Sequence, residues 1–130
     1  MRSVFMFLGA LCAFLGVAFG AFGAHALKNS LSVEALAIYH TGVDYQIWHA
    51  LGLLGIGLAQ QTSHESRLLP WAGWLMFAGI LLFSGSLYLL AYTNLMWLGM
   101  ITPLGGVCFL LAWLLLCISY IRREPASRYD

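Results

Sequence analysis

Four long apolar runs occupy nearly all of this 130-residue chain, and they restrict its fold more than any other feature. Only 8% of the residues are charged and 62% are hydrophobic, whereas about a quarter of the residues in a soluble domain are charged. A helix of about 20 apolar residues is long enough to cross the roughly 30 Å hydrocarbon layer of a bilayer. The sequence therefore predicts an all-α integral membrane protein with four transmembrane helices.

Short polar segments between the apolar runs give the expected bounds of the helices. We expect one transmembrane domain over residues 1–130, with spans at about residues 4–27, 43–60, 69–92 and 103–121. An unbroken helix from residue 33 to residue 59 would be about 40 Å long, which exceeds the hydrocarbon thickness. We therefore expect the chain to bend at Gly42, with a short interfacial helix at about residues 33–41 before the second span.

The basic residues predict which side of the membrane each end faces. In a four-span arrangement, Lys28 is the one basic residue on its side. The opposite side carries all the arginines, namely Arg2, Arg67, Arg122, Arg123 and Arg128. Basic residues concentrate on the cytoplasmic side of membrane proteins. Both termini are therefore expected in the cytoplasm.

Small residues recur every three or four positions along the first apolar run. They are Gly9, Ala13, Gly16, Gly20 and Gly23. This spacing places them on one face of a helix, where a second helix can approach closely. Packing inside the bundle is the favoured interpretation, and contact with a second copy of the chain in a homo-oligomer is the alternative.

Polar side chains collect toward the ends of the spans that lie opposite the arginines. The predicted interhelical polar cluster consists of His25, Tyr45, Gln46, His49, Ser84, Ser86 and Tyr88. A polar group at membrane depth is costly unless it has a partner, so these side chains are expected to bond between helices. The same cluster is also where a ligand site is expected, if the protein has one.

The start of the second helix is expected to lie at the non-cytoplasmic surface of the bilayer, which we call the outer interface. Its interfacial residues are Tyr39, His40 and Asp44. His40 and Asp44 are four residues apart, which places them on one face of a helix. A solvated ion pair is the favoured interpretation of these two side chains, and an acid–base pair is the alternative.

Several classes of function are disfavoured by what the residues offer. A net charge of +1 without a basic face argues against a nucleic-acid partner. His25 and His49 could serve as axial haem ligands, but no metal-binding spacing accompanies them, and Cys12, Cys108 and Cys117 lie far apart in apolar runs. We therefore expect no enzyme activity, no metal and no cofactor.

Four segments carry a resemblance to a known family. They read GAFGAHAL at residues 20–27, YHTGVDYQIWHA at 39–50, FSGSLY at 83–88 and ITPLGG at 101–106. In this order they resemble the family known as domain of unknown function 423, small bacterial membrane proteins that are similar to small eukaryotic transmembrane proteins. The resemblance implies a four-span protein of the bacterial cytoplasmic (inner) membrane and brings no reaction or cofactor with it.

Three functional hypotheses follow. The first is a non-enzymatic membrane protein that supports membrane integrity or partner assembly through helix packing, with lipids and a second copy of the chain as partners. The second is a carrier or receptor for a small or lipophilic molecule, bound in the outward-facing polar cluster. The third and most distant is a haem or redox subunit.

Overall fold

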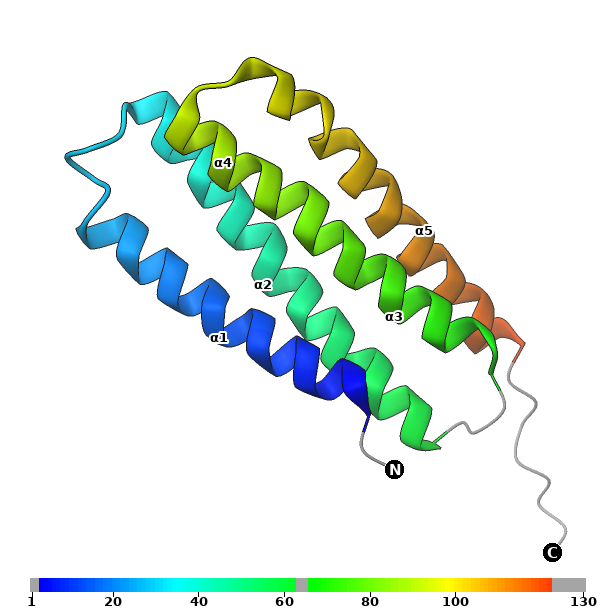
Figure 1. Cartoon of the computed structure of the whole chain (residues 1–130). Coiled ribbons are helices and arrows are strands. Elements are labelled where there is room, and N and C mark those ends of the chain that lie inside the picture. Colours follow the sequence, from blue (N-terminus) through cyan, green and yellow to red (C-terminus); the bar gives the residue numbers. More distant parts are fainter. Residues whose placement is uncertain (1–2, 63–65, 123–130) are drawn as a thin grey trace, which may run out of the picture.

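The computed structural model describes residues 3–62 and 66–122, and within these ranges every regular element is a helix. The elements are α1 (Val4–His25), α2 (Val33–Thr62), α3 (Leu68–Gly79), the π-helical turn η1 (Ile80–Ser84), α4 (Gly85–Thr93), the 3₁₀-helix η2 (Met96–Met100) and α5 (Thr102–Ile121). Because α3, η1 and α4 follow one another without a gap, they form one long rod, and the chain makes four antiparallel rods (Figure 1).

The order of packing places α2 in the interior of the bundle. α2 packs against α1 on one side and against α3, η1 and α4 on the other, while α5 packs against α3 and η1 (Figure 1). Arg67 and Arg122 lie at one end of the rods, which we call the arginine end. The connections at residues 26–32 and 94–101 lie at the opposite end, which we call the connection end (Figure 1).

Three of the rods are long and apolar enough to cross a membrane, namely Val4–His25, Leu68–Thr93 and Met96–Ile121. Three of the four predicted spans therefore have the required length and composition. The all-helical fold is confirmed for the described residues. α2 has 30 residues but a more polar sequence. Its position explains this difference, because Gln46 and His49 are only 4% and 5% exposed and are covered by the neighbouring rods.

The expected boundary at Gly42 is absent, because α2 is one continuous helix from Val33 to Thr62. Residues 33–41 form its first turns, and the backbone N–H of Ala35 donates to the Ser32 hydroxyl as a helix N-cap. Gly42 instead allows close packing: a Cβ placed there would lie 2.8 Å from Cε1 of Tyr88. A glycine that packs against a neighbouring ring does not need to interrupt a helix.

The π-helical turn was not predicted from the sequence, and it adjusts the long rod to two neighbours at once. The backbone N–H of Gly85 donates to the Ile80 carbonyl, a spacing of five residues. On one side, the backbone of Phe83 packs directly against Gly105 of α5. On the other side, Ser84 is buried against α2.

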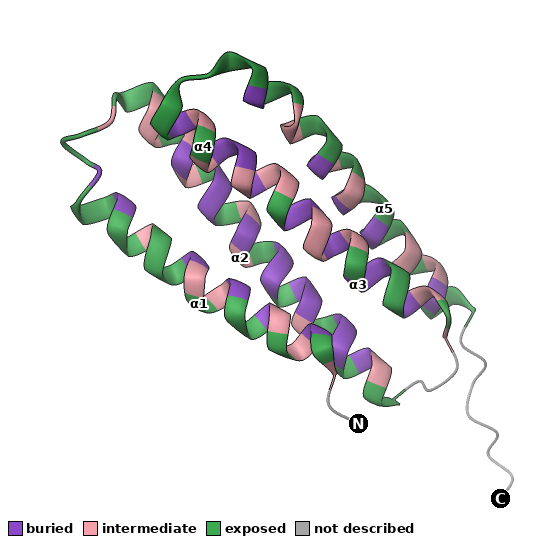
Figure 2. Cartoon of the chain, viewed as in Figure 1, coloured by how far each residue is buried: buried purple, intermediate pink, exposed green. Residues whose placement is uncertain are grey.

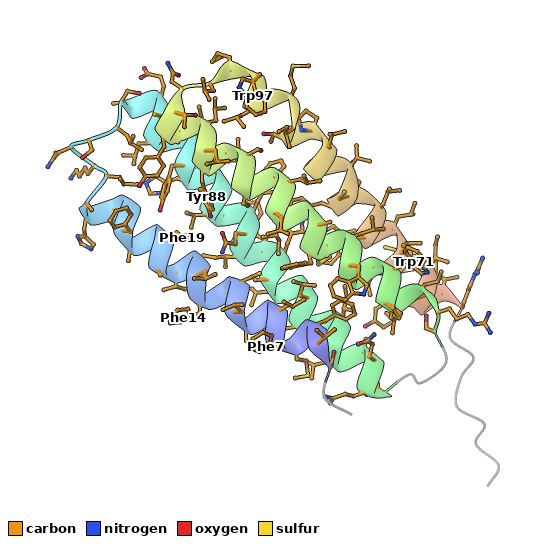
Figure 3. All side chains as sticks on the ribbon, in the orientation of Figure 1. Phe7, Phe14, Phe19, Trp71, Tyr88 and Trp97 are labelled. Carbon is orange, nitrogen blue, oxygen red and sulfur yellow. The ribbon has the colours of Figure 1, made fainter. Side chains whose placement is uncertain are left out.

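The largest apolar cluster lies toward the arginine end of the bundle. Phe5, Leu53, Ile56, Leu69 and Met76 are its largest fully buried apolar side chains. The Phe5 ring lies against Gly73 and makes an edge-to-face contact with Trp74, with 5.2 Å between ring centres. Buried positions concentrate on α2, whereas the outward faces of α1 and α5 are mostly exposed (Figure 2). Phe7 and Phe14 point away from the bundle on α1 (Figure 3).

The small-residue stripe of α1 faces α2 within the same chain. A Cβ added to Gly9 would lie 2.8 Å from the Ala50 carbonyl oxygen, and one added to Gly16 would lie 2.7 Å from Cγ1 of Ile47. Gly20 and Gly23 likewise approach Val43 and Tyr39 of α2. Ala13 is partly buried against the large apolar cluster. A homo-oligomer would therefore have to use a different surface from this stripe.

Candidate functional site

A single buried glutamine joins three helices. The Gln46 side chain extends from α2, where its Nε2 donates to the Cys12 carbonyl oxygen of α1 over 2.9 Å. Its Oε1 accepts from the Tyr88 hydroxyl of α4 over 2.6 Å. We call these three groups the Gln46 bridge. Both ends of the amide are bonded, so the cost of burying it is offset by contacts that hold α1, α2 and α4 together.

The glycines of α1 make its backbone carbonyls accessible to α2. Side chains on a helix lean toward its N-terminus and partly cover the carbonyl of the preceding turn. Cys12 is followed four residues later by Gly16, and Phe19 is followed four residues later by Gly23, so both carbonyls lack this cover. The first accepts from Gln46, and the second accepts from the Tyr39 hydroxyl over 2.5 Å.

Tyr39, which the sequence placed at the outer interface, therefore has a further role in joining α2 to α1. It is only 3% exposed, and its ring lies near Tyr88, with 5.2 Å between ring centres. Sequence analysis missed this role because a tyrosine near a helix start is also typical of a membrane interface. Its spacing from Gln46 and the glycine pattern of α1 were the signals that could have revealed it.

Two further bonds tie the long rod to its neighbours. The Ser84 hydroxyl donates to the Gly42 carbonyl of α2 over 2.6 Å. The Ser86 hydroxyl donates to the Phe83 carbonyl and lies 2.6 Å from the Thr102 hydroxyl of α5. Thr102 was not among the residues of the predicted cluster, and its contact with Ser86 adds it.

His49 and Tyr45 belong to a separate aromatic group between α2 and α5. The Nδ1 atom of His49 lies 2.7 Å from the Tyr45 carbonyl oxygen of the same helix. Its ring lies flat against Phe109, with 3.5 Å between ring centres and 11° between ring planes. The Tyr45 ring packs against Phe83 at 4.4 Å. In this structure His49 contributes stacking to the bundle and takes no part in the Gln46 bridge.

His25 lies apart from the rest of the predicted cluster. It is exposed at the end of α1, whereas the bond from Gln46 places the middle of α2 level with Cys12. Cys12 and His25 are 13 positions apart, which corresponds to about 20 Å along a helix. His25 and His49 therefore do not share one polar network, and they are not placed as a pair of axial ligands.

The other predicted residues at the connection end are closer to the surface. His40 is half-buried with its ring beside Tyr39, and Asp44 is exposed. His40 and Asp44 do not form an ion pair in the structure. Across residues 3–62 and 66–122, no group of three His, Cys, Asp or Glu side chains converges as a metal-binding set.

Comparison with known proteins identifies relatives over most of the chain. The family described as "Protein of unknown function (DUF423)" matches residues 19–106. A UPF0382 membrane protein of Staphylococcus saprophyticus is 50% identical over 116 residues, which cover 89% of this chain and 95% of that protein. The UPF0382 membrane protein YwdK of Bacillus subtilis is 46% identical over 119 residues, which cover 92% and 97%.

No solved structure matches the chain. The family match includes all four segments in which the resemblance was recognised, and that identification is confirmed. The chain belongs to the DUF423 family.

Proposed function

We propose that this member of the DUF423 family is a non-enzymatic, four-span protein of the bacterial inner membrane that acts through helix packing, in membrane integrity or in the assembly of a partner. The observation that carries the proposal is the use of the buried polar atoms. Among the described residues, every buried side-chain nitrogen and oxygen has a hydrogen-bond partner within the chain. The best-placed polar groups, in the Gln46 bridge, are bonded between helices.

The arrangement of the rods supports α2 as the fourth span. α2 runs antiparallel to two apolar rods, each long enough to cross a membrane, and packs against both along its length. A helix in this position has to cross with its neighbours. Thirty residues of helix measure about 45 Å, so the first turns of α2 extend beyond the hydrocarbon layer into the outer interface.

The basic residues that the structure describes support an orientation with both termini in the cytoplasm. Arg67 and Arg122 lie at the arginine end, and Lys28 lies at the connection end. The positive-inside tendency then assigns the arginine end to the cytoplasm. Arg2, Arg123 and Arg128, which entered the same prediction, lie outside the described residues. A reporter fused after residue 130 tests this assignment, and a periplasmic reporter would overturn it.

Lipids are the first partners of such a protein, and a second copy of the chain is the protein partner that we propose. The glycine stripe is buried against α2, so a contact between copies would use the exposed apolar faces of α1 or α5. Native mass spectrometry of the protein in lipid nanodiscs measures how many copies of the chain associate. A monomer at every protein-to-lipid ratio would remove the homo-oligomer from the proposal.

The role itself is tested by complementation in a bacterium whose own DUF423 gene has been deleted. Entry of a normally excluded dye reports a loss of membrane integrity. The wild-type chain is expected to restore exclusion of the dye. His25→Ala and Asp44→Asn, which change exposed polar groups, are expected to complement fully, whereas Gly16→Leu is expected to fail. Loss of complementation by either polar variant, at unchanged protein level and stability, would indicate a chemical role and overturn the proposal.

A further inference from the structure

The two connections at the connection end differ sharply in the side chains that they expose. Residues 26–32 expose Lys28, Asn29, Ser30 and Ser32. Residues 94–101 contain no charged side chain, and Leu95, Met96, Trp97 and Met100 are 46%, 77%, 57% and 77% exposed. Trp97 extends from η2 at the opposite end of the bundle from Trp71 (Figure 3). We call residues 94–101 the apolar connection and residues 26–32 the polar connection.

The apolar connection is an ordered part of the bundle. Leu98 is only 4% exposed and anchors η2 against the rest of the chain. Asn94 adopts a left-handed conformation, with φ of 56°, that ends α4 and lets the chain turn back. The exposed apolar side chains are therefore held outward by a turn with a defined shape.

Several of its backbone N–H groups are bonded within the chain, which lowers the cost of placing them where water is scarce. A peptide group without a partner is costly where water is scarce. The backbone N–H of Asn94 donates to Leu90, that of Leu98 to Leu95, and that of Ile101 to Leu98. The N–H of Leu95 faces the Thr93 hydroxyl.

The exposed apolar side chains continue the outward face of α5. Leu104, Val107 and Leu110 are 59%, 52% and 72% exposed along that face. No acidic or basic residue interrupts the stretch Met96–Ile121. At about 1.5–2.0 Å per residue this stretch is roughly 40 Å long, which exceeds the hydrocarbon layer of about 30 Å. A turn that folds back at the membrane surface accommodates the excess.

We propose that η2 lies in the lipid interface, with Met96, Trp97 and Met100 inserted among the lipids of one leaflet, while the polar connection at the same end of the bundle remains in water. Tryptophan favours the headgroup level of a bilayer, and methionine adapts to a disordered apolar surface. The absence of charge from the apolar connection fits neutral or zwitterionic lipid, because residues 94–101 offer no basic side chain to anionic headgroups. The inference requires that the bundle crosses the membrane. It is independent of the orientation of the bundle and of a non-enzymatic role.

Thiol accessibility in vesicles tests the proposal. The starting protein is the full chain with Cys12, Cys108 and Cys117 replaced by alanine, reconstituted in phosphatidylcholine vesicles. Single cysteines are then introduced by Met96→Cys and Met100→Cys, with Asn29→Cys in the polar connection as the matched control at the same end. A charged, membrane-impermeant maleimide is expected to label the Asn29→Cys protein at least about tenfold faster than either methionine variant. Equal labelling rates would overturn the proposal.

A second measurement separates lipid from a second copy of the chain as the cause of protection. With an environment-sensitive fluorophore attached at position 96, lipids brominated near the headgroup end of their chains are expected to quench emission. The degree of quenching is expected to stay constant as the protein is diluted in lipid. Absence of quenching would overturn the lipid assignment. Protection from labelling that is lost when the protein is diluted in lipid, together with disulfide formation between copies, would assign the surface to protein contact and would also overturn it.

Discussion

The two halves of this bundle are held together by different interactions. Toward the arginine end, Phe5, Leu53 and Met76 fill the space between helices with apolar atoms. Toward the connection end, Gln46, Tyr39 and Ser84 donate from their side chains to backbone carbonyls of neighbouring helices. In lipid, apolar contact between helices has no hydrophobic advantage over contact with lipid tails, so shape and hydrogen bonds must decide which helices associate. The arginine-end half relies mainly on the fit between apolar side chains, whereas the connection-end half also uses directional hydrogen bonds between helices.

The largest expected effect comes from overfilling the α1–α2 contact, where the two kinds of interaction meet. In Gly9→Leu, the new side chain would begin 2.8 Å from the Ala50 carbonyl and 2.9 Å from the Leu54 backbone nitrogen, and neither atom can rotate away. We expect a loss of about 3 kcal/mol in unfolding free energy, at the upper end of the cost of overpacking. Unfolding by SDS in mixed micelles measures it, with Ala10→Leu on the exposed face of α1 as control. Equal stability of both variants would contradict the close contact.

The next effect tests whether hydrogen bonds dominate in the connection-end half. Gln46→Leu removes the acceptor of Tyr88 and the donor to Cys12, so we expect a loss of about 1–2 kcal/mol. A double-mutant cycle with Tyr88→Phe isolates the bond between the two side chains. Its coupling energy is expected to be about 0.6–1.7 kcal/mol, as for other hydrogen bonds between membrane helices. Strict additivity of the two substitutions would show that this bond contributes nothing.

A smaller effect distinguishes stacking from hydrogen bonding at His49, which lies between the two halves. Because the ring lies flat on Phe109, His49→Ala should lose about 1 kcal/mol of aromatic contact. His49→Phe should restore most of it, since the Tyr45 carbonyl that faces Nδ1 lies in the same helix. If the phenylalanine variant is as unstable as the alanine variant, the imidazole nitrogens matter and His49 belongs with the polar half.

The smallest effect is expected at His25. It is exposed at the end of α1 and lies outside both groups, so His25→Ala should change the unfolding free energy by less than about 0.5 kcal/mol. The same SDS titration measures it. A loss comparable to that of Gln46→Leu would show that His25 belongs to the polar network of the connection-end half.

Features that depend on local sequence were predictable in advance. The helical membrane class followed from long apolar runs, and the α1 glycine face followed from residue type and helical periodicity. These properties depend on residues within a few turns of one another. The family identification likewise rested on short contiguous segments.

Only the tertiary structure decided which neighbour covers each face. The polar sequence of α2 suggested a break at Gly42 and did not show that Tyr39 bonds to α1. In the structure α2 is continuous and Tyr39 is buried, because α1 and α4 surround this part of the helix. Hydropathy describes a helix as if all its faces met the same solvent. The partners of Gln46 lie 34 and 42 residues away in sequence, and they are brought within bonding distance by packing between helices that no local pattern specifies.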